Sequence, residues 1–236
     1  MRHSDGDTNM QGMGSDQEFW ALLTRGEQDV LSALGRISVF PSGATMCVEG
    51  EPTTHVFVLV TGWVKILSVT SGGRELVLAL RGKGDIVGEI AGATTGRRTA
   101  TVKSIGTVRA LIVPYDKFGS FLDSNPGADR AFRRVVTRKW NDEDTRLRGR
   151  ADTTGAQRLA RLLLELADRY GRNADGLSDV AMPLSQEELG SLVGASRATV
   201  TRALNNWRKR GFVRTGQRRI TIVDEAGLRQ VAGRAP

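Results

Sequence analysis

The chain has 236 residues, of which 39% are hydrophobic and 25% charged, and this length allows two domains with buried cores. Its formal net charge of +8 and sequence pI near 10.3 favour a polyanionic partner. No apolar run approaches the roughly 20 residues of a membrane span, and the only Cys/His residues (Cys47, His3 and His55) exclude an all-cysteine iron–sulfur cluster or a Cys/His zinc site within one chain.

We therefore expect a cytoplasmic protein without a membrane partner or a metal site. The N-terminus lacks the apolar core of a signal peptide. Residues 1–16 are polar and show no periodicity, which predicts a disordered tail. Between residues 19 and 34 apolar side chains recur at helical spacing, which predicts one or two short amphipathic helices.

Residues 37–113 contain short β-branched runs separated by turn residues, including a turn at Thr61 and Gly62. The runs predict eight short strands, at residues 38–40, 45–48, 56–60, 63–69, 75–80, 86–87, 100–104 and 107–113. Strands of this length and spacing are typical of an antiparallel barrel or double-sheet roll. We assign residues 17–124 to this roll, with a short helix at 118–122.

One segment inside the predicted roll, residues 84–100, is not explained by strand chemistry. Its repeated glycines allow backbone N–H groups to approach an anion closely. The Glu89 carboxylate can accept hydrogen bonds from a ribose hydroxyl, and the Arg98 guanidinium, with Thr99 beside it, suits a phosphate. These residues predict a nucleotide site; the alternative is a surface ion pair. Arg97 either turns outward or helps to bind a more highly charged ligand.

Asn125 and Pro126 predict the start of a long helix that runs to about Ala151. An apolar stripe along it has the spacing of a helix that packs against a partner and contains Phe132, Val135, Val136, Trp140, Leu147 and Ala151. Acidic residues at 142–144 and Gly149 interrupt the stripe, which makes the helix a candidate bistable element. We predict that residues 125–151 form a dimerisation helix, with the seam at Val136, Trp140, Glu143, Asp144 and Leu147.

A break at residues 152–155 predicts a C-terminal domain over residues 152–236, beginning with an amphipathic helix at 156–170. Residues 184–207 have the spacing of a helix-turn-helix, in which Gly194 takes the turn position and Ser196 caps the second helix. Residues 212–223 alternate like the two strands of a wing. The predicted DNA contacts are Ser196, Arg197, Thr199, Thr201 and Arg202 in the helix and Arg214, Arg218 and Arg219 in the wing.

The alternative for this region is a small helical subdomain with a solvated basic face. Residues 197–219 include many basic side chains and no acidic one, beside a predicted wing. This combination favours binding to duplex DNA.

Two motifs resemble those of the cyclic-AMP receptor protein family, the CRP/FNR transcription regulators. The phosphate-binding signature of that family, GEL or GEI followed by R-S/T-A, is matched by residues 88–90 (GEI) and 98–100 (RTA). The recognition-helix motif SRETVGR is matched by residues 196–202, SRATVTR. The resemblance covers nearly everything after the tail. It implies that Glu89 meets a ribose and Arg98 a cyclic phosphate, so the candidate ligand residues are Gly88, Glu89, Ile90, Arg98, Thr99 and Ala100.

The resemblance implies an α+β fold with an N-terminal antiparallel β-roll, a long dimerisation helix and a C-terminal winged helix-turn-helix. The implied function is a homodimeric, sequence-specific transcription regulator and not an enzyme. Its expected partners are double-stranded DNA with a palindromic operator, a second copy of the chain, and RNA polymerase. No cofactor is obligatory, and a cyclic nucleotide is the candidate effector.

Two departures from the family pattern leave alternatives open. Ala198 stands where the family commonly has glutamate, so this chain lacks the carboxylate that would accept a hydrogen bond from cytosine N4. The acidic segment NDEDT, near residues 142–145, stands where members that respond to cyclic AMP carry Thr-Ser or Thr-Asn. The alternatives are a ligand-independent regulator of the same architecture, a response to cyclic GMP or a cyclic dinucleotide, and an enzyme or a nucleotide-binding module without DNA function.

Overall fold

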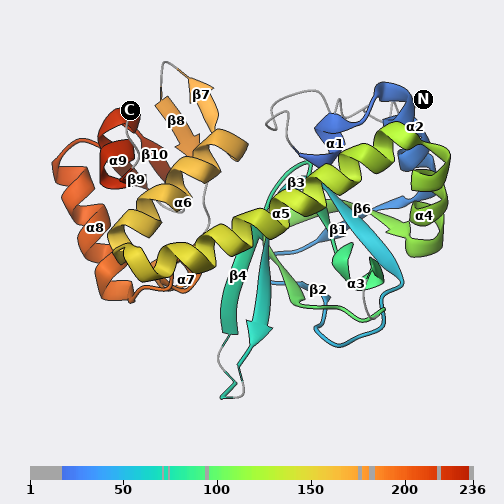
Figure 1. Cartoon of the computed structure of the whole chain (residues 1–236), viewed down its shortest axis with the longest axis horizontal. Helices are drawn as coiled ribbons and strands as arrows, with labels where there is room; N and C mark the ends of the chain where they lie inside the picture. The colour runs from blue at the N-terminus through green and yellow to red at the C-terminus, as the bar shows by residue number, and fades with distance from the viewer. Residues whose placement is uncertain are drawn as a thin grey trace, which may run out of the picture.

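The computed structural model describes residues 18–70, 72–73, 75–93, 96–174, 177–180, 184–216 and 219–233. The predicted tail at residues 1–16 lies outside the described residues. Figure 1 shows an N-terminal β-roll and a C-terminal winged-helix domain, with the long helix α5 (Pro126–Asp152) running from one to the other. This mixture of helices and antiparallel sheet confirms the predicted fold class.

The roll is built on an antiparallel sheet whose main path runs β1, β6, β3, β4, while β2 pairs with β6 and β5 pairs with β3. Because β4 ends this path, its outer edge is available to another element. The bounds are β1 (Arg36–Phe40), β2 (Thr45–Cys47), β3 (His55–Val69), β4 (Glu75–Arg81), β5 (Ile86–Val87) and β6 (Thr101–Pro114).

The turn predicted at Thr61 and Gly62 does not separate two strands. β3 continues through it, with Gly62 at φ +86° and its register against β6 shifting on either side of Thr61. A Cβ at Gly62 would lie 2.5 Å from the carbonyl oxygen of Thr107, so the neighbouring strand passes too close for a side chain. β6 likewise continues through Gly106, at φ +70°. The prediction of four separate strands here was wrong, because the glycines allow irregularities within two long strands.

Short helices cover one end of the roll. They are α1 (Phe19–Leu22), α2 (Arg25–Leu34), α4 (Tyr115–Ser124) and the first turns of α5 (Figure 1), whereas α3 (Ile90–Ala93) lies within the 84–100 segment. The Thr24 side chain accepts from the Glu27 backbone N–H in a capping box, which starts α2. Phe19, Phe118 and Phe132 meet edge to face in the core beneath these helices. The helix predicted at 118–122 is therefore present and longer.

The winged-helix domain follows α5 after a two-residue break. Its elements are α6 (Gly155–Tyr170), β7 (Arg172–Ala174), β8 (Leu177–Val180), α7 (Gln186–Val193), α8 (Arg197–Lys209), β9 (Val213–Gly216), β10 (Arg219–Ile222) and α9 (Glu225–Val231). The sheet order is β7, β8, β10, β9. β7 and β8 were not predicted, because these short segments lack apolar alternation. They are strands because β8 pairs with β10 and β7 pairs with β8.

The winged-helix domain docks on the outer edge of β4 through α7. The Val77 backbone N–H donates to Ser191 Oγ at 2.9 Å, across the domain boundary. Beside it, Lys65 Nζ contacts Glu188 Oε1 at 2.7 Å. Helix α7 thus satisfies the Val77 N–H, which β4 would otherwise expose at its edge.

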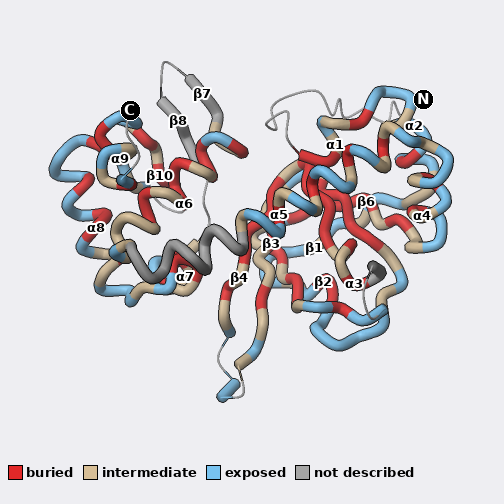
Figure 2. Tube along the Cα trace, in the orientation of Figure 1, coloured by how far each residue is buried: buried red, intermediate tan, exposed pale blue. Residues whose placement is uncertain are grey.

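The hydrophobic core is continuous across this contact. The Trp63 ring of β3 packs edge-on against Tyr170 of α6, with centroids 4.7 Å apart. Figure 2 shows buried segments of β3 and β4 reaching toward the buried face of α6 and α7. The roll contributes Leu67, Val77 and Leu80 to the cluster that contains Leu159, Leu163, Leu192, Leu204 and Trp207 of the winged-helix domain.

None of the helices in the described part of the chain combines the length and apolar character that crossing a bilayer requires. The same residues contain no group of three or more His, Cys, Asp or Glu side chains arranged to hold a metal ion.

Candidate ligand pocket and DNA-binding surface

A cavity of about 590 Å³ lies between the roll and helix α5. The sheet, the 87–91 segment and the 98–100 segment form its walls, and Lys139 and Trp140 of α5 close one side. Its volume lies in the range of small-molecule sites. The cavity brings together every residue predicted for the ligand: Gly88, Glu89, Ile90, Arg98, Thr99 and Ala100.

The Glu89 carboxylate is buried and paired with a cation that sequence reasoning did not assign. Lys139 Nζ donates to Glu89 Oε1 at 2.6 Å and to the Ile86 carbonyl oxygen at 2.6 Å. The two side chains are only 3% and 5% exposed. Desolvation lowers the pKa of Lys139, and the charge of Glu89 opposes that shift. A ligand hydroxyl that binds Glu89 must therefore share this carboxylate with Lys139 or displace the ammonium.

Arg98 and Arg97 occupy different surroundings. The Arg98 guanidinium is buried, lies 5.6 Å from the Phe57 ring centroid and donates to the Gly88 carbonyl at 3.2 Å. A Cβ at Gly88, where φ is +85°, would lie 2.2 Å from Arg98 Nη1, so glycine makes room for the guanidinium. Arg97 is exposed and donates to the Gly50 carbonyl at 2.8 Å. Of the two arginines, Arg98 is the one that lines the cavity.

The cavity carries more positive than negative side chains. Arg81, Arg98 and Lys139 line it together with the Glu89 carboxylate, which suits an anionic occupant. The alternative of a surface ion pair between Glu89 and Arg98 does not fit, because both side chains are buried. A signal for Lys139 was present in the sequence: it follows the buried Val135 by four residues and so shares the inward face of α5.

Helices α7 and α8 and the turn between them have the predicted helix-turn-helix geometry. Gly194 ends α7 in the left-handed region at φ +59°, and Ser196 Oγ accepts from the Thr199 backbone N–H at 3.1 Å to cap α8. A Cβ at Gly190 would lie 2.6 Å from the Ala195 carbonyl oxygen, so glycine permits the close approach of the turn. The local motif thus determines how α8 is presented.

The outer face of α8 carries the predicted DNA contacts. Arg197, Ala198 and Arg202 are exposed, whereas Val200 and Ala203 are buried on the opposite face. Thr199 and Thr201 are half-buried. The Thr201 hydroxyl lies within hydrogen-bonding distance of the Arg197 carbonyl oxygen, at 2.9 Å, and of Gln186 Oε1 of α7, so it is held between the two helices. Arg197 and Arg202 are therefore the exposed basic side chains among the contacts predicted on α8.

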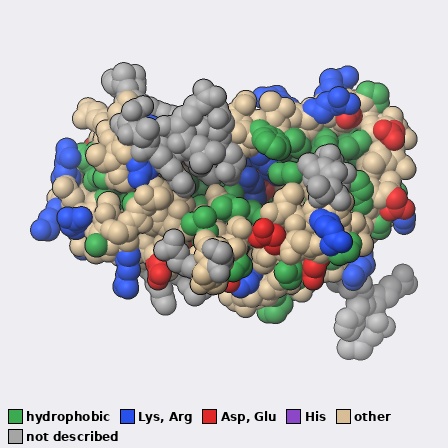
Figure 3. Space-filling model, turned by 60° about the horizontal axis from the view of Figure 1, so that its bottom comes forward, with side chains coloured by type: hydrophobic (Ala, Val, Ile, Leu, Met, Phe, Trp, Pro, Cys, Tyr) green, Lys and Arg blue, Asp and Glu red, His purple; other side chains and the backbone are tan. Residues whose placement is uncertain are grey.

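The wing adds further basic side chains. β9 and β10 pair in antiparallel register, and Arg214 and Arg219 are exposed on them. Arg218 lies outside the described residues. In Figure 3 Lys and Arg side chains project from the left-hand end of the molecule, where the winged-helix domain lies. This end presents a positive surface to a polyanion.

The apolar stripe predicted along α5 is divided between two faces. Val135 is fully buried and Phe132 packs beside it in the roll core. Val136 is half-buried, and Trp140 is 60% exposed even though it lines the cavity. The other predicted seam residues, Glu143, Asp144 and Leu147, lie on α5, but their side chains are outside the described part.

Comparisons with known proteins match both the roll that holds the cavity and the domain that carries α8. A cyclic nucleotide-binding domain model matches residues 37–125, and a Crp-like helix-turn-helix domain model matches residues 157–231. A Mycobacterium tuberculosis protein described as a CRP-like cAMP-activated global transcriptional regulator is 34% identical over 189 residues, covering 80% of this chain and 84% of that protein. The chain belongs to the CRP/FNR family of transcription regulators.

A second curated relative and a solved structure are also similar to this chain. The cAMP-activated global transcriptional regulator CRP of Salmonella typhimurium is 28% identical over 173 residues, covering 71% of this chain and 80% of that protein. The solved structure of FixK2 from Bradyrhizobium japonicum superposes with a TM-score of 0.74 at 21% identity, covering 86% of this chain and 99% of that one, which shows the shared fold. The protein is therefore a DNA-binding transcription regulator with a cyclic nucleotide-binding domain, and its family is not one of enzymes.

Proposed function

We propose that this CRP/FNR regulator acts as a homodimer on a palindromic operator and is controlled by a cyclic nucleotide in the roll cavity. The observation that carries the proposal is the pairing, within one chain, of an exposed basic recognition helix with a cavity lined by Glu89 and Arg98. Helix α5 links the two, because it lines the cavity and leads into the winged-helix domain.

Helix α8 suits a DNA major groove. Guanidinium groups such as those of Arg197 and Arg202 bind guanine O6 and N7 in a bidentate manner, and recognition helices use their N-terminal residues for base contacts. Arg214, Arg219 and Arg218 of the wing suit backbone phosphates. Two copies of α8 on half-sites about one DNA turn apart would read a palindrome. Because Ala198 has no acceptor for cytosine N4, we expect an operator that differs from the one typical of the family.

The first test is selection of an operator from genomic fragments, followed by titration of that duplex and a scrambled one at two salt concentrations. Arg197→Ala and Arg202→Ala should each weaken operator binding by about 1 to 3 kcal/mol and relax sequence preference. Arg219→Ala should weaken both duplexes alike and reduce the salt dependence. Identical behaviour of the three variants would contradict the division of roles. Failure to select any duplex would contradict the DNA function.

Cyclic AMP is the first candidate effector. The M. tuberculosis relative is described as cAMP-activated. The cavity of this chain offers a buried guanidinium for a cyclic phosphate and a carboxylate for a ribose hydroxyl. Cyclic GMP and a cyclic dinucleotide are the second candidates. The additional cations Arg81 and Lys139 favour the dinucleotide, because it carries two phosphates.

Arg98 and Arg97 provide a matched test of the effector. Calorimetric titration with cyclic AMP and cyclic GMP should give saturable binding that weakens about tenfold to hundredfold in Arg98→Ala, because one charge-assisted hydrogen bond is lost. Arg97→Ala removes the same charge outside the cavity and should leave the affinity unchanged. Equal losses in the two variants would contradict the assignment of Arg98. If neither nucleotide gives a heat of binding, the result would favour a ligand-independent regulator of the same architecture.

Dimerisation through α5 is part of the proposal. Trp140 is a large aromatic side chain left 60% exposed on this helix, and Val136 lies one turn before it. A second copy packed along α5 would cover both, and Glu143, Asp144 and Leu147 would continue the seam. RNA polymerase as a partner and the cytoplasm as the compartment remain predictions from the family.

A further inference from the structure

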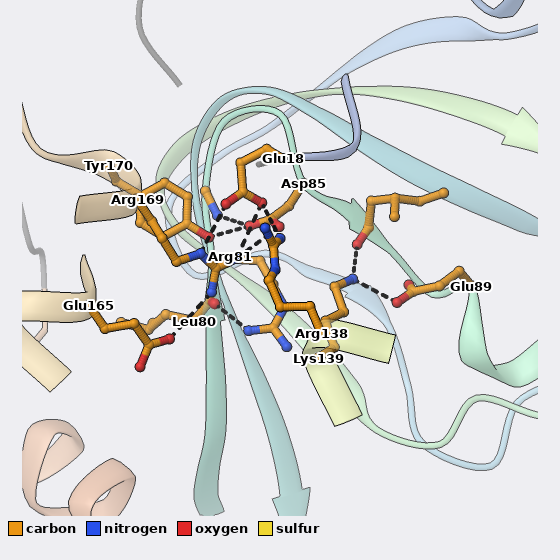
Figure 4. Close-up of polar contacts among 12 residues, drawn as sticks. Glu18, Leu80, Arg81, Asp85, Glu89, Arg138, Lys139, Glu165, Arg169 and Tyr170 are labelled. Atoms are coloured by element: carbon orange, nitrogen blue, oxygen red, sulfur yellow. Dashed lines mark hydrogen bonds and ion pairs between the residues drawn. The ribbon is translucent and has the colours of Figure 1, made fainter. Parts of the chain in front are cut away.

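A cluster of buried charged and polar side chains joins the two domains. Glu18 precedes α1, Asp85 lies in the turn before β5, Arg138 comes from α5, and Arg169 and Tyr170 end α6. Figure 4 shows these side chains pointing toward one another where the four segments meet. Glu18 and Asp85 are fully buried, and the Arg169 side chain is only 8% exposed. We call these five residues the interdomain ion cluster.

The ion cluster connects the winged-helix domain to the roll directly. Arg169 Nε donates to Glu18 Oε1 at 2.9 Å, and its Nη2 contacts Asp85 Oδ1 at 3.4 Å. The Tyr170 hydroxyl donates to Asp85 Oδ2 at 2.5 Å. The Asp85 carboxylate also accepts from the Gly82 backbone N–H at 2.8 Å, which fixes its turn. Separation of the domains breaks all of these contacts. Removal of Arg169 alone would leave the Glu18 and Asp85 carboxylates buried without their cation, so these ion pairs tie the winged-helix domain to the roll.

Helix α5 brings the ion cluster next to the cavity. Arg138 Nη2 contacts Glu18 Oε2 at 3.2 Å, while the adjacent Lys139 contacts Glu89 in the cavity at 2.6 Å. Consecutive residues of an α-helix point about 100° apart, so one turn of backbone serves two different sites. Lys139 also donates to the Ile86 carbonyl at 2.6 Å, immediately after Asp85. The same short stretches of chain therefore hold both the cavity wall and the ion cluster.

We propose that Lys139 and Arg138 couple the cavity to the interdomain ion cluster, so that the contacts of Lys139 inside the cavity set how firmly the winged-helix domain is held on the roll. A group that draws Lys139 away from Glu89 and Ile86 moves the backbone that positions Arg138 and Asp85. This inference gives the proposed ligand site its route to the DNA-binding domain. The coupling is a property of the protein alone and is testable without ligand.

The Val77 backbone N–H reports directly on domain docking. It lies on the outer edge of β4 and donates to Ser191 of α7 rather than to another strand. When the winged-helix domain leaves the roll, this amide loses its partner and exchanges with solvent. Amides in the middle of β3 and β6 instead require the sheet itself to open.

Hydrogen exchange of the whole chain, resolved by residue, tests the coupling. The double variant Lys139→Met with Glu89→Gln removes both charges of the pair, so neither is left buried alone. We expect its Val77 amide to exchange about tenfold faster than in the unaltered protein, with β3 and β6 amides unchanged. Arg169→Met, which breaks the ion cluster itself, should give the same local acceleration. Arg97→Met is the matched control outside the cavity and should leave the exchange rate of the Val77 amide unchanged.

An unchanged Val77 rate in the double variant, together with acceleration in Arg169→Met, would overturn the coupling. An unchanged rate in Arg169→Met would show that the ion cluster does not hold the domain and would also overturn it. The double variant could accelerate amide exchange throughout the sheet. In that case Lys139→Arg is used in its place, because it keeps the charge and changes the geometry. Its Val77 amide is then expected to exchange faster while the β3 and β6 amides do not. Adding cyclic AMP to the unaltered protein separates the two proposals, because a null result there contradicts the effector and leaves the variant results standing.

Discussion

Glu18 and Asp85 show how burial and neighbours separate two similar carboxyl groups. Burial, followed by the adjacent Asp85 carboxylate, raises the pKa of Glu18 to about 7. Burial also opposes ionisation of Asp85, but the hydrogen bond from Glu18 and the charges of Arg169, Arg81 and Lys139 outweigh it, so its pKa is held well below the usual value. The pair therefore retains a proton on Glu18 up to neutral pH.

This titration predicts a stability that depends on pH. Because the pKa of Glu18 is higher in the folded protein, its contribution to the free energy of unfolding is complete below about pH 4.5 and is lost as the pH rises through about 7. We expect Glu18→Gln, which mimics the protonated carboxyl, to flatten the decline in stability between about pH 5 and pH 8.

Urea unfolding at a series of pH values measures this decline. Glu27→Gln is the control. The pKa of the Glu27 carboxyl is lowered, mainly by the hydrogen bond that it accepts from the Thr24 backbone N–H, so this group does not titrate between about pH 5 and pH 8. The same decline in Glu18→Gln as in the unaltered protein would show that another group titrates.

At the scale of elements, helices were easier to predict than strand boundaries. The starts of α5 and α8 follow from Pro126 and the Ser196 cap, which are signals within a few residues of each start. The start of α6 follows from the break at residues 152–155, where the structure adds a capping box at Thr154. The glycines at 62 and 106 give the same local signal whether they end a strand or allow an irregularity within one. The long pairing of β3 with β6 decides between these outcomes.

Helix α5 shows a second limit of local patterns. Periodicity indicated one apolar stripe, but the structure buries Val135 against the roll and leaves Trp140 exposed. Lys139, whose charge by itself favours exposure to solvent, is buried because Glu89 and the Ile86 carbonyl meet its ammonium. Spacing identifies a face, and only the packed neighbours determine what that face contacts.

At the scale of the whole molecule, the exposed Trp140 leads to a prediction about assembly. Trp140→Asp should shift the chain toward monomer and weaken binding to a palindromic operator by at least about tenfold, because aromatic side chains often dominate interface energies. Sedimentation equilibrium and operator titration measure the two effects.

Val39→Asp provides the control for Trp140→Asp, since Val39 is an exposed apolar residue, 62% exposed, on β1 of the roll. An unchanged dimer in Trp140→Asp, or equal disruption in Val39→Asp, would place the seam elsewhere.

The sequence by itself determined the division into roll, long helix and helix-turn-helix. It also identified six of the residues that line the cavity and the exposed arginines of α8. Those features depend on periodicity, caps and motifs contained in short stretches of chain, where local sterics and hydrogen bonding suffice. Only the tertiary structure decided that Lys139 neutralises Glu89 from 50 positions away and that Arg169 meets Glu18 across 151 positions. Such pairs form because packing removes both charges from water together, and no local pattern specifies which distant groups that packing brings into contact.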